Sequence, residues 1–180
     1  MNQYATMIRN LKSPEVMERL MHLYGRRDGM LVEQTGRYIG LLKRHEELFH
    51  ENREVLMISA PGRTEIGGNH TDHNRGRVLA AAINLDTLSA VSARDDMMVE
   101  IHYPAIKVDL GSLDVVEKEK GKTHALVRGV AARMAELGYK IGGFNAAVTS
   151  NVMSGSGLSS SAAFEVMTCA IFDALYNGFP

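Results

Sequence analysis

The first third of the chain alternates apolar and charged positions at helical spacing. Apolar side chains recur three and four positions apart among lysines, arginines and glutamates up to about residue 54, which is the spacing of one buried helix face. Ser13, Pro14 and Glu15 are the residue types of a helix start, with Ser13 as the cap. The pattern predicts amphipathic helices that form a helical N-terminal arm over residues 1–54.

After residue 54 the pattern changes to short runs of β-branched and other apolar residues. Such runs predict strands, which we expect at residues 55–59, 78–93, 97–103 and 106–110. Asp95 and Asp96 indicate a turn between two of these runs. Residues 144–152 alternate apolar and polar side chains, which predicts one more, half-buried strand.

Two further helices are expected in the second half of the chain. Thr123 is the expected cap of a helix over residues 123–137, and Gly138 is in the usual position to end it. Residues 158–176 are apolar on nearly every side, which is typical of a helix that lies deep in a domain. The charged residues 117–122 are expected to form a solvated surface loop.

Composition indicates an ordinary globular protein. Of the 180 residues, 45% are hydrophobic and 23% charged, which suffices for a real core and argues against disorder. A formal net charge of −1 gives no basic footprint for nucleic acid or an anionic membrane, so small molecules are the expected partners. The single cysteine, Cys169, excludes an internal disulfide, and its apolar surroundings predict a buried, inert thiol.

The expected location is the cytoplasm. A lone cysteine is compatible with a reducing compartment. The sequence also has no basic segment followed by an apolar stretch and a cleavage site at its start, and no run of about 18 apolar residues.

The strongest chemical signal is a glycine- and serine-rich segment, residues 153–163, which follows a predicted strand and opens a predicted helix. Gly155 and Gly157 let the backbone approach a ligand closely, and the free N–H groups of a helix start form a site for phosphate. The segment has neither the ending of the common P-loop nor the three-glycine spacing of a dinucleotide fold. The alternative is that its serines merely cap a helix and its glycines merely form a turn.

A second polar segment, residues 60–74, places Asn, His, Asp and Arg side chains beside three glycines. Such a mixture of donors and acceptors is typical of recognition of a polyhydroxylated ligand. A zinc site of a metal-dependent hydrolase at His70, Asp72 and His73 is an alternative, although the other histidines lack ligand-like spacing to them. A solvent-exposed loop without function is another.

Together the two segments resemble the first two signature motifs of the GHMP small-molecule kinases, and within them the galactokinase branch. Residues that match in the first segment are Arg63, His70, Thr71, Asp72 and Asn74, and the second match covers residues 155–162. The likeness runs from about Ala60 to Tyr176. It departs at Asn69, where galactokinases carry Glu, so a different hexose, an amino sugar or another sugar derivative is compatible with the pocket.

The resemblance implies an α+β fold, namely the ribosomal protein S5 domain 2-like N-terminal lobe of a GHMP kinase with the helical N-terminal arm in front of it. On this interpretation residues 55–180 form the sugar- and ATP-phosphate-binding domain. The implied activity is transfer of the γ-phosphoryl group of ATP to a sugar hydroxyl, with Mg²⁺ as the metal. The principal alternative is a non-catalytic sugar- or nucleotide-sensing regulator of the same fold.

The same resemblance implies roles for individual residues. Arg63 would stabilise charge beside the reacting oxygen, and Ser161 would contact Mg²⁺. The implied sugar-binding residues are Asn69, His70 and Asp72, and the implied ATP-binding residues are Gly155, Ser156, Gly157, Leu158, Ser159, Ser160 and Ser161. The family's catalytic base and third motif would lie beyond Pro180, so the 180-residue chain alone is expected to show little or no turnover.

Overall fold

The computed structural model describes residues 3–50, 53–68, 71, 74–102, 105–153, 155 and 157–178. Its elements, in chain order, are α1 (Gln3–Asn10), α2 (Pro14–Tyr24), α3 (Met30–Phe49), β1 (Val55–Gly67), β2 (Leu79–Ala93), β3 (Met98–His102), β4 (Ile106–Asp109), the 3₁₀ turn η2 (Glu117–Glu119), α4 (Thr123–Glu136), β5 (Phe144–Ser150) and α5 (Ser160–Tyr176). The amphipathic helices and the strands expected from the sequence are thus present, with shifted ends.

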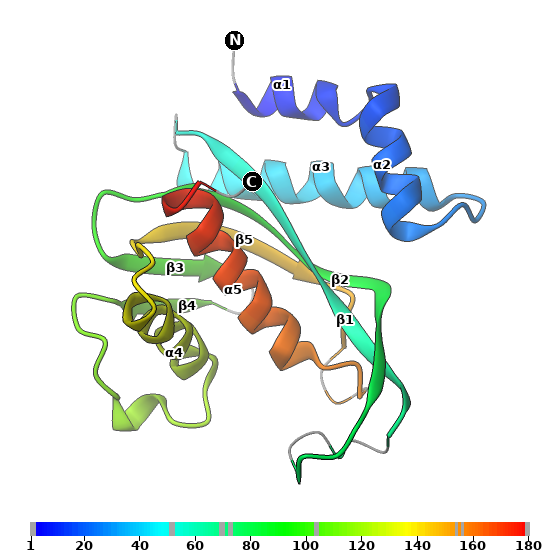
Figure 1. Ribbon diagram of the computed structural model, residues 1–180. Coiled ribbons are helices and arrows are strands. Elements are labelled where there is room, and N and C mark those ends of the chain that lie inside the picture. Colours follow the sequence, from blue (N-terminus) through cyan, green and yellow to red (C-terminus); the bar gives the residue numbers. More distant parts are fainter. Residues whose placement is uncertain are drawn as a thin grey trace.

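The five strands form one mixed sheet in the order β1-β2-β5-β3-β4. β3 and β5 run parallel, whereas the other neighbours are antiparallel. β2 pairs with β5 only over residues 87–93, but it pairs with β1 from Leu79 onward. The β1–β2 pair therefore continues as a two-stranded ribbon beyond the other strands (Figure 1).

Helices cover both faces of the sheet (Figure 1). On one face α4 and α5 enclose a core that includes Val91, Ile101, Phe144, Met167 and Phe172. On the other face α1 to α3 enclose a second core that includes Tyr4, Leu20, Leu42, Leu88 and Ala147. The predicted α+β fold is confirmed, and the division into an arm and a domain stays a prediction.

The helix ends test the capping predictions. Ser13 caps α2 as expected, because its Oγ accepts the Val16 N–H at 3.4 Å and Pro14 is the first helical residue. Gly138 follows the end of α4 with a φ of +85°, a conformation that glycine adopts without strain. Thr123 is not a cap, because it is already the first residue of α4.

The predictions of a fully buried last helix and a buried thiol are wrong. α5 buries one side only, through residues such as Phe164, Met167 and Ile171. On its other side Val166 is 56% exposed and Cys169 is exposed. The reason is geometric: one sheet can bury only one side of a helix, and no other described element covers the outer side.

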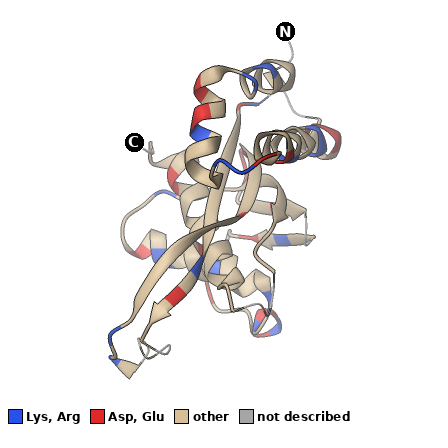
Figure 2. Cartoon of the chain, turned by 90° about the vertical axis from the view of Figure 1, so that its right-hand side faces the viewer, with Lys and Arg blue, Asp and Glu red and all other residues tan. Residues whose placement is uncertain are grey.

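Charged residues of both signs are distributed along the helices, strands and loops, as the colours of the cartoon in Figure 2 show. This mixture agrees with the formal net charge of −1. Within the described ranges, no helix has both the length and the apolar character needed to cross a bilayer.

The charged segment at residues 117–122 is not simply a solvated loop, because Glu119 is buried. Arg128 of α4 donates to both Glu119 carboxylate oxygens, at 2.8 Å and 2.9 Å. The same guanidinium donates to the carbonyl oxygens of Asp109 and Ser112. Arg128 therefore fastens η2 and the end of β4 to α4. The hydrogen bonds from Arg128 to the Glu119 carboxylate hold the pKa of Glu119 below its ordinary value.

Replacing Glu119 with Gln should lower the free energy of unfolding by about 1–2 kcal/mol at pH 7, because Arg128 loses its charged acceptor. A carboxyl group whose pKa is lower in the folded protein stabilises the fold at pH values above its ordinary pKa of about 4.3. That stabilisation is lost as the pH falls through the lower pKa of the folded state. The difference between wild type and Glu119→Gln should therefore shrink progressively as the pH falls below the ordinary carboxyl pKa and through the lowered pKa of the folded state. Urea unfolding at several pH values measures it.

The matched control is Glu136→Gln. Glu136 pairs with Arg133 at 2.9 Å, but both side chains are more than half exposed, so the expected loss is about 0–0.5 kcal/mol. Equal losses in the two variants, or a Glu119→Gln effect independent of pH, would contradict this account of the Arg128 contact.

Candidate functional site

Arg63 lies on a strand and not in the loop that the sequence indicated. β1 continues to Gly67, eight residues beyond the expected end at residue 59. The pairing of β1 with β2 is irregular between Pro61 and Arg63, and such irregularities redirect side chains near functional sites. Arg63 is half-buried there.

The ribbon strand β1 contacts the glycine- and serine-rich segment directly. The Arg63 N–H donates to the Leu158 carbonyl oxygen at 3.1 Å. At the preceding residue, Gly62, an added Cβ would lie 2.9 Å from the same Leu158 oxygen and 3.0 Å from Cγ1 of Val152. Only a residue without a side chain permits this approach, and it brings together the two segments that the sequence singled out.

The backbone before α5 takes left-handed conformations at alternate positions. φ is +76° at Gly155, +75° at Gly157 and +61° at Ser159. Nothing lies within 4 Å of a Cβ added at Gly155 or Gly157, so these glycines are required by their dihedral angles and not by crowding. Left-handed residues in a turn direct successive N–H groups toward a common concavity, which is a preferred environment for anions.

Three consecutive serines, Ser159, Ser160 and Ser161, form the start of α5. Ser159 occupies the cap position, but within the part of the chain that the structure describes its side chain makes no capping hydrogen bond. Ser160 is half-buried and Ser161 exposed in the first helical turn. Ser159 is therefore not a side-chain cap. Ser154 and Ser156 lie outside the described residues, so the alternative in which the serines only cap a helix and the glycines only form a turn stays a prediction.

Several predicted site residues lie outside the described residues, namely Asn69, His70, Asp72, His73 and Ser156. The flanks of the first segment are described. Thr71 Oγ1 donates to the Gly68 carbonyl at 2.8 Å, and the N–H groups of Asn74 and Gly76 donate to the Thr71 carbonyl at 3.0 Å and 2.8 Å. Thr71 is thus the centre of a tight turn at the tip of the β1–β2 ribbon.

No metal centre is evident in the described ranges, where no three His, Cys, Asp or Glu side chains gather as ligands do. The proposed zinc ligands His70, Asp72 and His73 are not among those residues, so this finding does not test the hydrolase alternative.

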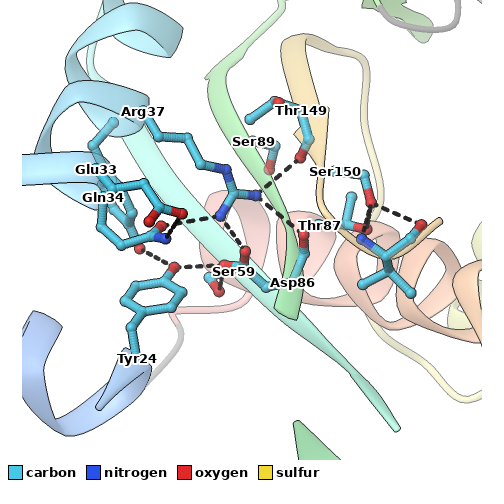
Figure 3. Close-up of polar contacts among 12 residues, drawn as sticks. Tyr24, Glu33, Gln34, Arg37, Ser59, Asp86, Thr87, Ser89, Thr149 and Ser150 are labelled. Carbon is cyan, nitrogen blue, oxygen red and sulfur yellow. Dashed lines mark hydrogen bonds and ion pairs between the residues drawn. The ribbon is translucent and has the colours of Figure 1, made fainter. Parts of the chain in front are cut away.

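Sequence reasoning missed a buried polar cluster beneath the site (Figure 3). Asp86 of β2 is only 2% exposed and accepts hydrogen bonds from Tyr24 at 2.6 Å, from Ser59 and from Arg37. Burial, and then the hydrogen bond to Asp86, raises the pKa of Tyr24 far above its ordinary value, so its hydroxyl remains a donor. The available signal was an aspartate inside an apolar strand, since carboxylates are seldom buried without partners.

Two family profiles match the chain. One is the galactokinase galactose-binding signature, at residues 43–93, and the other is the GHMP kinases N-terminal domain, at residues 125–179. The galactokinase of Lactococcus lactis subsp. lactis (strain IL1403) is 32% identical over 153 residues, and that of Roseiflexus sp. (strain RS-1) is 36% identical over 121 residues. These alignments include 82% and 67% of this chain but 38% and 31% of the relatives, so the chain spans well under half of their length.

Solved structures of a galactokinase and of a mevalonate kinase are also similar to this chain. The crystal structure of Lactococcus lactis galactokinase complexed with galactose superposes with a TM-score of 0.70 at 30% identity, over 80% of this chain and 39% of that one. Methanococcus jannaschii mevalonate kinase superposes with a TM-score of 0.57 at 16% identity, over 72% of this chain and 43% of that one. At such low identity the second likeness concerns the fold alone.

Replacing Gly62 with Ala should lower the free energy of unfolding by about 1–3 kcal/mol, because the new methyl group would force β1 away from Leu158 and Val152. Denaturant unfolding measures the loss.

Gly67→Ala is the control on the same strand. Nothing lies within 4 Å of a Cβ at Gly67, so this variant should change stability by less than about 0.5 kcal/mol. A Gly62→Ala protein as stable as Gly67→Ala would mean that the close approach of β1 to the loop is absent in solution.

Proposed function

Because the chain belongs to the GHMP kinase family and carries its galactokinase signature, we propose that the protein containing it is an ATP-dependent sugar kinase. The proposal is supported most by one contact, the hydrogen bond from the Arg63 N–H to the Leu158 carbonyl at 3.1 Å. It holds β1, at Arg63, beside the start of α5. Phosphoryl transfer depends mainly on such placement of donor and acceptor, together with stabilisation of developing charge.

The segment from Gly155 to Ser161 is the proposed cradle for the ATP phosphates. Its left-handed glycines, the space around them and the start of α5 without a side-chain cap meet the requirements of an anion site. Ser161 is the proposed contact of a phosphate-bound Mg²⁺, because its exposed hydroxyl lies in the first turn of α5. Mg²⁺ prefers oxygen ligands and commonly retains phosphate oxygens in its shell.

Arg63 is the proposed source of positive charge beside the reaction. In the transfer, a sugar hydroxyl oxygen forms a bond to the γ-phosphorus, the bond from that phosphorus to the β,γ-bridging oxygen breaks, and the hydroxyl proton leaves to a base. A guanidinium placed beside the phosphoryl oxygens stabilises their negative charge in the transition state. This role is supported by the contact of the Arg63 backbone with Leu158, directly before the start of α5.

The proposed acceptor is a hexose or a hexose derivative, held by Asn69, His70 and Asp72. The galactokinase galactose-binding signature supports a sugar of this class. An amide at residue 69 binds a hydroxyl without adding charge, which also permits an acceptor other than galactose.

Replacing Gly157 with Val should weaken binding of an ATP analogue with Mg²⁺ by about tenfold or more in the intact gene product. A β-branched residue does not adopt a φ of +75° without strain of about 1–3 kcal/mol, so the loop would take another shape. Calorimetry measures the affinity, and sugar binding should change less than twofold.

Gly138→Val is the matched control, because Gly138 has a φ of +85° and equally open surroundings at the far end of α4. It should lose similar stability and retain nucleotide affinity. Parallel loss of sugar and nucleotide binding in Gly157→Val, or equal loss in both variants, would show that the loop is only structural.

A panel of sugars offered with ATP and Mg²⁺ should release ADP from the intact gene product for at least one hexose or hexose derivative. Thermal stabilisation by a sugar without ADP release would instead favour the sensing regulator. Full turnover by residues 1–180 alone would contradict the expectation that the catalytic base lies further along the chain.

A further inference from the structure

Asp86 lies where the sheet narrows to the ribbon. It directly precedes Thr87, the first residue of β2 to pair with β5. Its side chain is 4% exposed and accepts donors from three different elements, namely Tyr24 of α2, Arg37 of α3 and Ser59 of β1. One carboxylate therefore connects both strands of the ribbon to the helices behind the sheet.

Arg37 also joins the backbones of two strands. While Nη1 pairs with the Asp86 carboxylate, Nη2 donates to the Asp86 carbonyl at 3.1 Å and to the Thr149 carbonyl at 3.4 Å. Figure 3 shows the guanidinium between Asp86 and Thr149. Its fork thus spans β2 and β5 at the last residues before β5 leaves the sheet.

From Asp86, hydrogen bonds continue to Asn151 and Val152, the residues directly before the glycine- and serine-rich segment (residues 153–163), which we call the phosphate loop. The Asn151 N–H donates to the Asp86 carbonyl at 2.9 Å. The hydroxyls of Thr87 and Ser150 are 2.9 Å apart, and Ser150 Oγ accepts the Val152 N–H at 3.1 Å. Val152 is the residue whose side chain contacts the site of Gly62, so the cluster reaches the place where the loop and β1 meet.

The same carboxylate fixes β1 just before Arg63. Ser59 donates its hydroxyl to Asp86, and Pro61 is the register partner of Asp86. The irregularity in β1 follows at once, between Pro61 and Arg63. Asp86 thereby holds the last regular part of β1, and beyond it the Arg63 N–H donates to the Leu158 carbonyl oxygen.

We propose that Arg37 and Asp86 act as positioning residues for phosphoryl transfer: they hold the end of β5 and the middle of β1 so that the phosphate loop and Arg63 keep their mutual placement. The proposal rests on the proposed kinase function for its kinetic consequences. Within the part of the chain that the structure describes, the hydrogen bonds of both residues go to the helices and to the strand backbones and not to residues 155–161, so both would act through the backbones that they fasten.

The competing account is that the cluster only attaches the N-terminal helices to the sheet. Tyr24 separates the two accounts, because in the described part of the chain its hydroxyl bonds to Tyr38 of α3 and to the Asp86 carboxylate and not to β5. Tyr24→Phe removes an anchor of the helices alone. Arg37→Lys keeps a positive charge beside Asp86 but has one nitrogen in place of the two by which Arg37 contacts the carboxylate and the two carbonyls.

The first test is amide hydrogen exchange of the intact gene product, which needs no assumption about its activity. Arg37→Lys should accelerate exchange at Asn151 and Val152 by tenfold or more, whereas Tyr24→Phe should leave these amides within twofold of wild type. Asp86→Asn is the second variant if Arg37→Lys does not fold, because it retains the side-chain shape and the backbone carbonyl of Asp86. It should also accelerate exchange at Asn151 and Val152, by a smaller factor than Arg37→Lys.

The second test is steady-state kinetics with the sugar that gives ADP release. Arg37→Lys should raise KM for ATP about fivefold and lower kcat, with KM for the sugar changed less than twofold, and Tyr24→Phe should leave both KM values unchanged. Unchanged exchange and kinetics in Arg37→Lys and Asp86→Asn, or equal effects in Tyr24→Phe, would overturn the positioning role. A wild-type protein without kinase activity would refute the proposed function, and the exchange result would still decide whether Arg37 holds the loop.

Discussion

One backbone hydrogen bond, from the Arg63 N–H to the Leu158 carbonyl oxygen, joins the two chemically distinctive segments of the chain. It forms only because Gly62 has no side chain, since a Cβ there would lie 2.9 Å from the same oxygen. The hydrogen bond thereby places the backbone of Arg63 beside the start of α5. The proposed phosphoryl transfer would depend on this proximity, because it needs positive charge near the phosphate groups.

The rest of the fold keeps this contact in place. α5 packs on the sheet through Phe164, Met167 and Ile171, which fixes where its first turn lies relative to β1. On the opposite face the N-terminal helices share a core with β2 and β5. Between the faces, the cluster of Arg37 and Asp86 connects β1, β2 and β5 at the level where the ribbon begins.

Sequence patterns predicted the strands and the amphipathic helices, because the periodicity of apolar residues is a local property of the chain. They did not predict that β1 continues through Arg63, since polar residues interrupt the apolar run there although β2 still pairs with them. They also placed Cys169 inside the core, because apolarity does not tell which side of a helix a sheet will cover. The partners of Asp86 come from 27 to 62 residues away along the chain, a separation that no local pattern encodes.

The most direct measurement is a crystal structure of the intact gene product with Mg²⁺ and a non-hydrolysable ATP analogue. We predict triphosphate density at the start of α5, within hydrogen-bonding distance of the N–H groups between Gly157 and Ser161, and beside Arg63. Triphosphate bound elsewhere, or a helix start filled by the protein's own side chains, would contradict the assignment of this region as the nucleotide site.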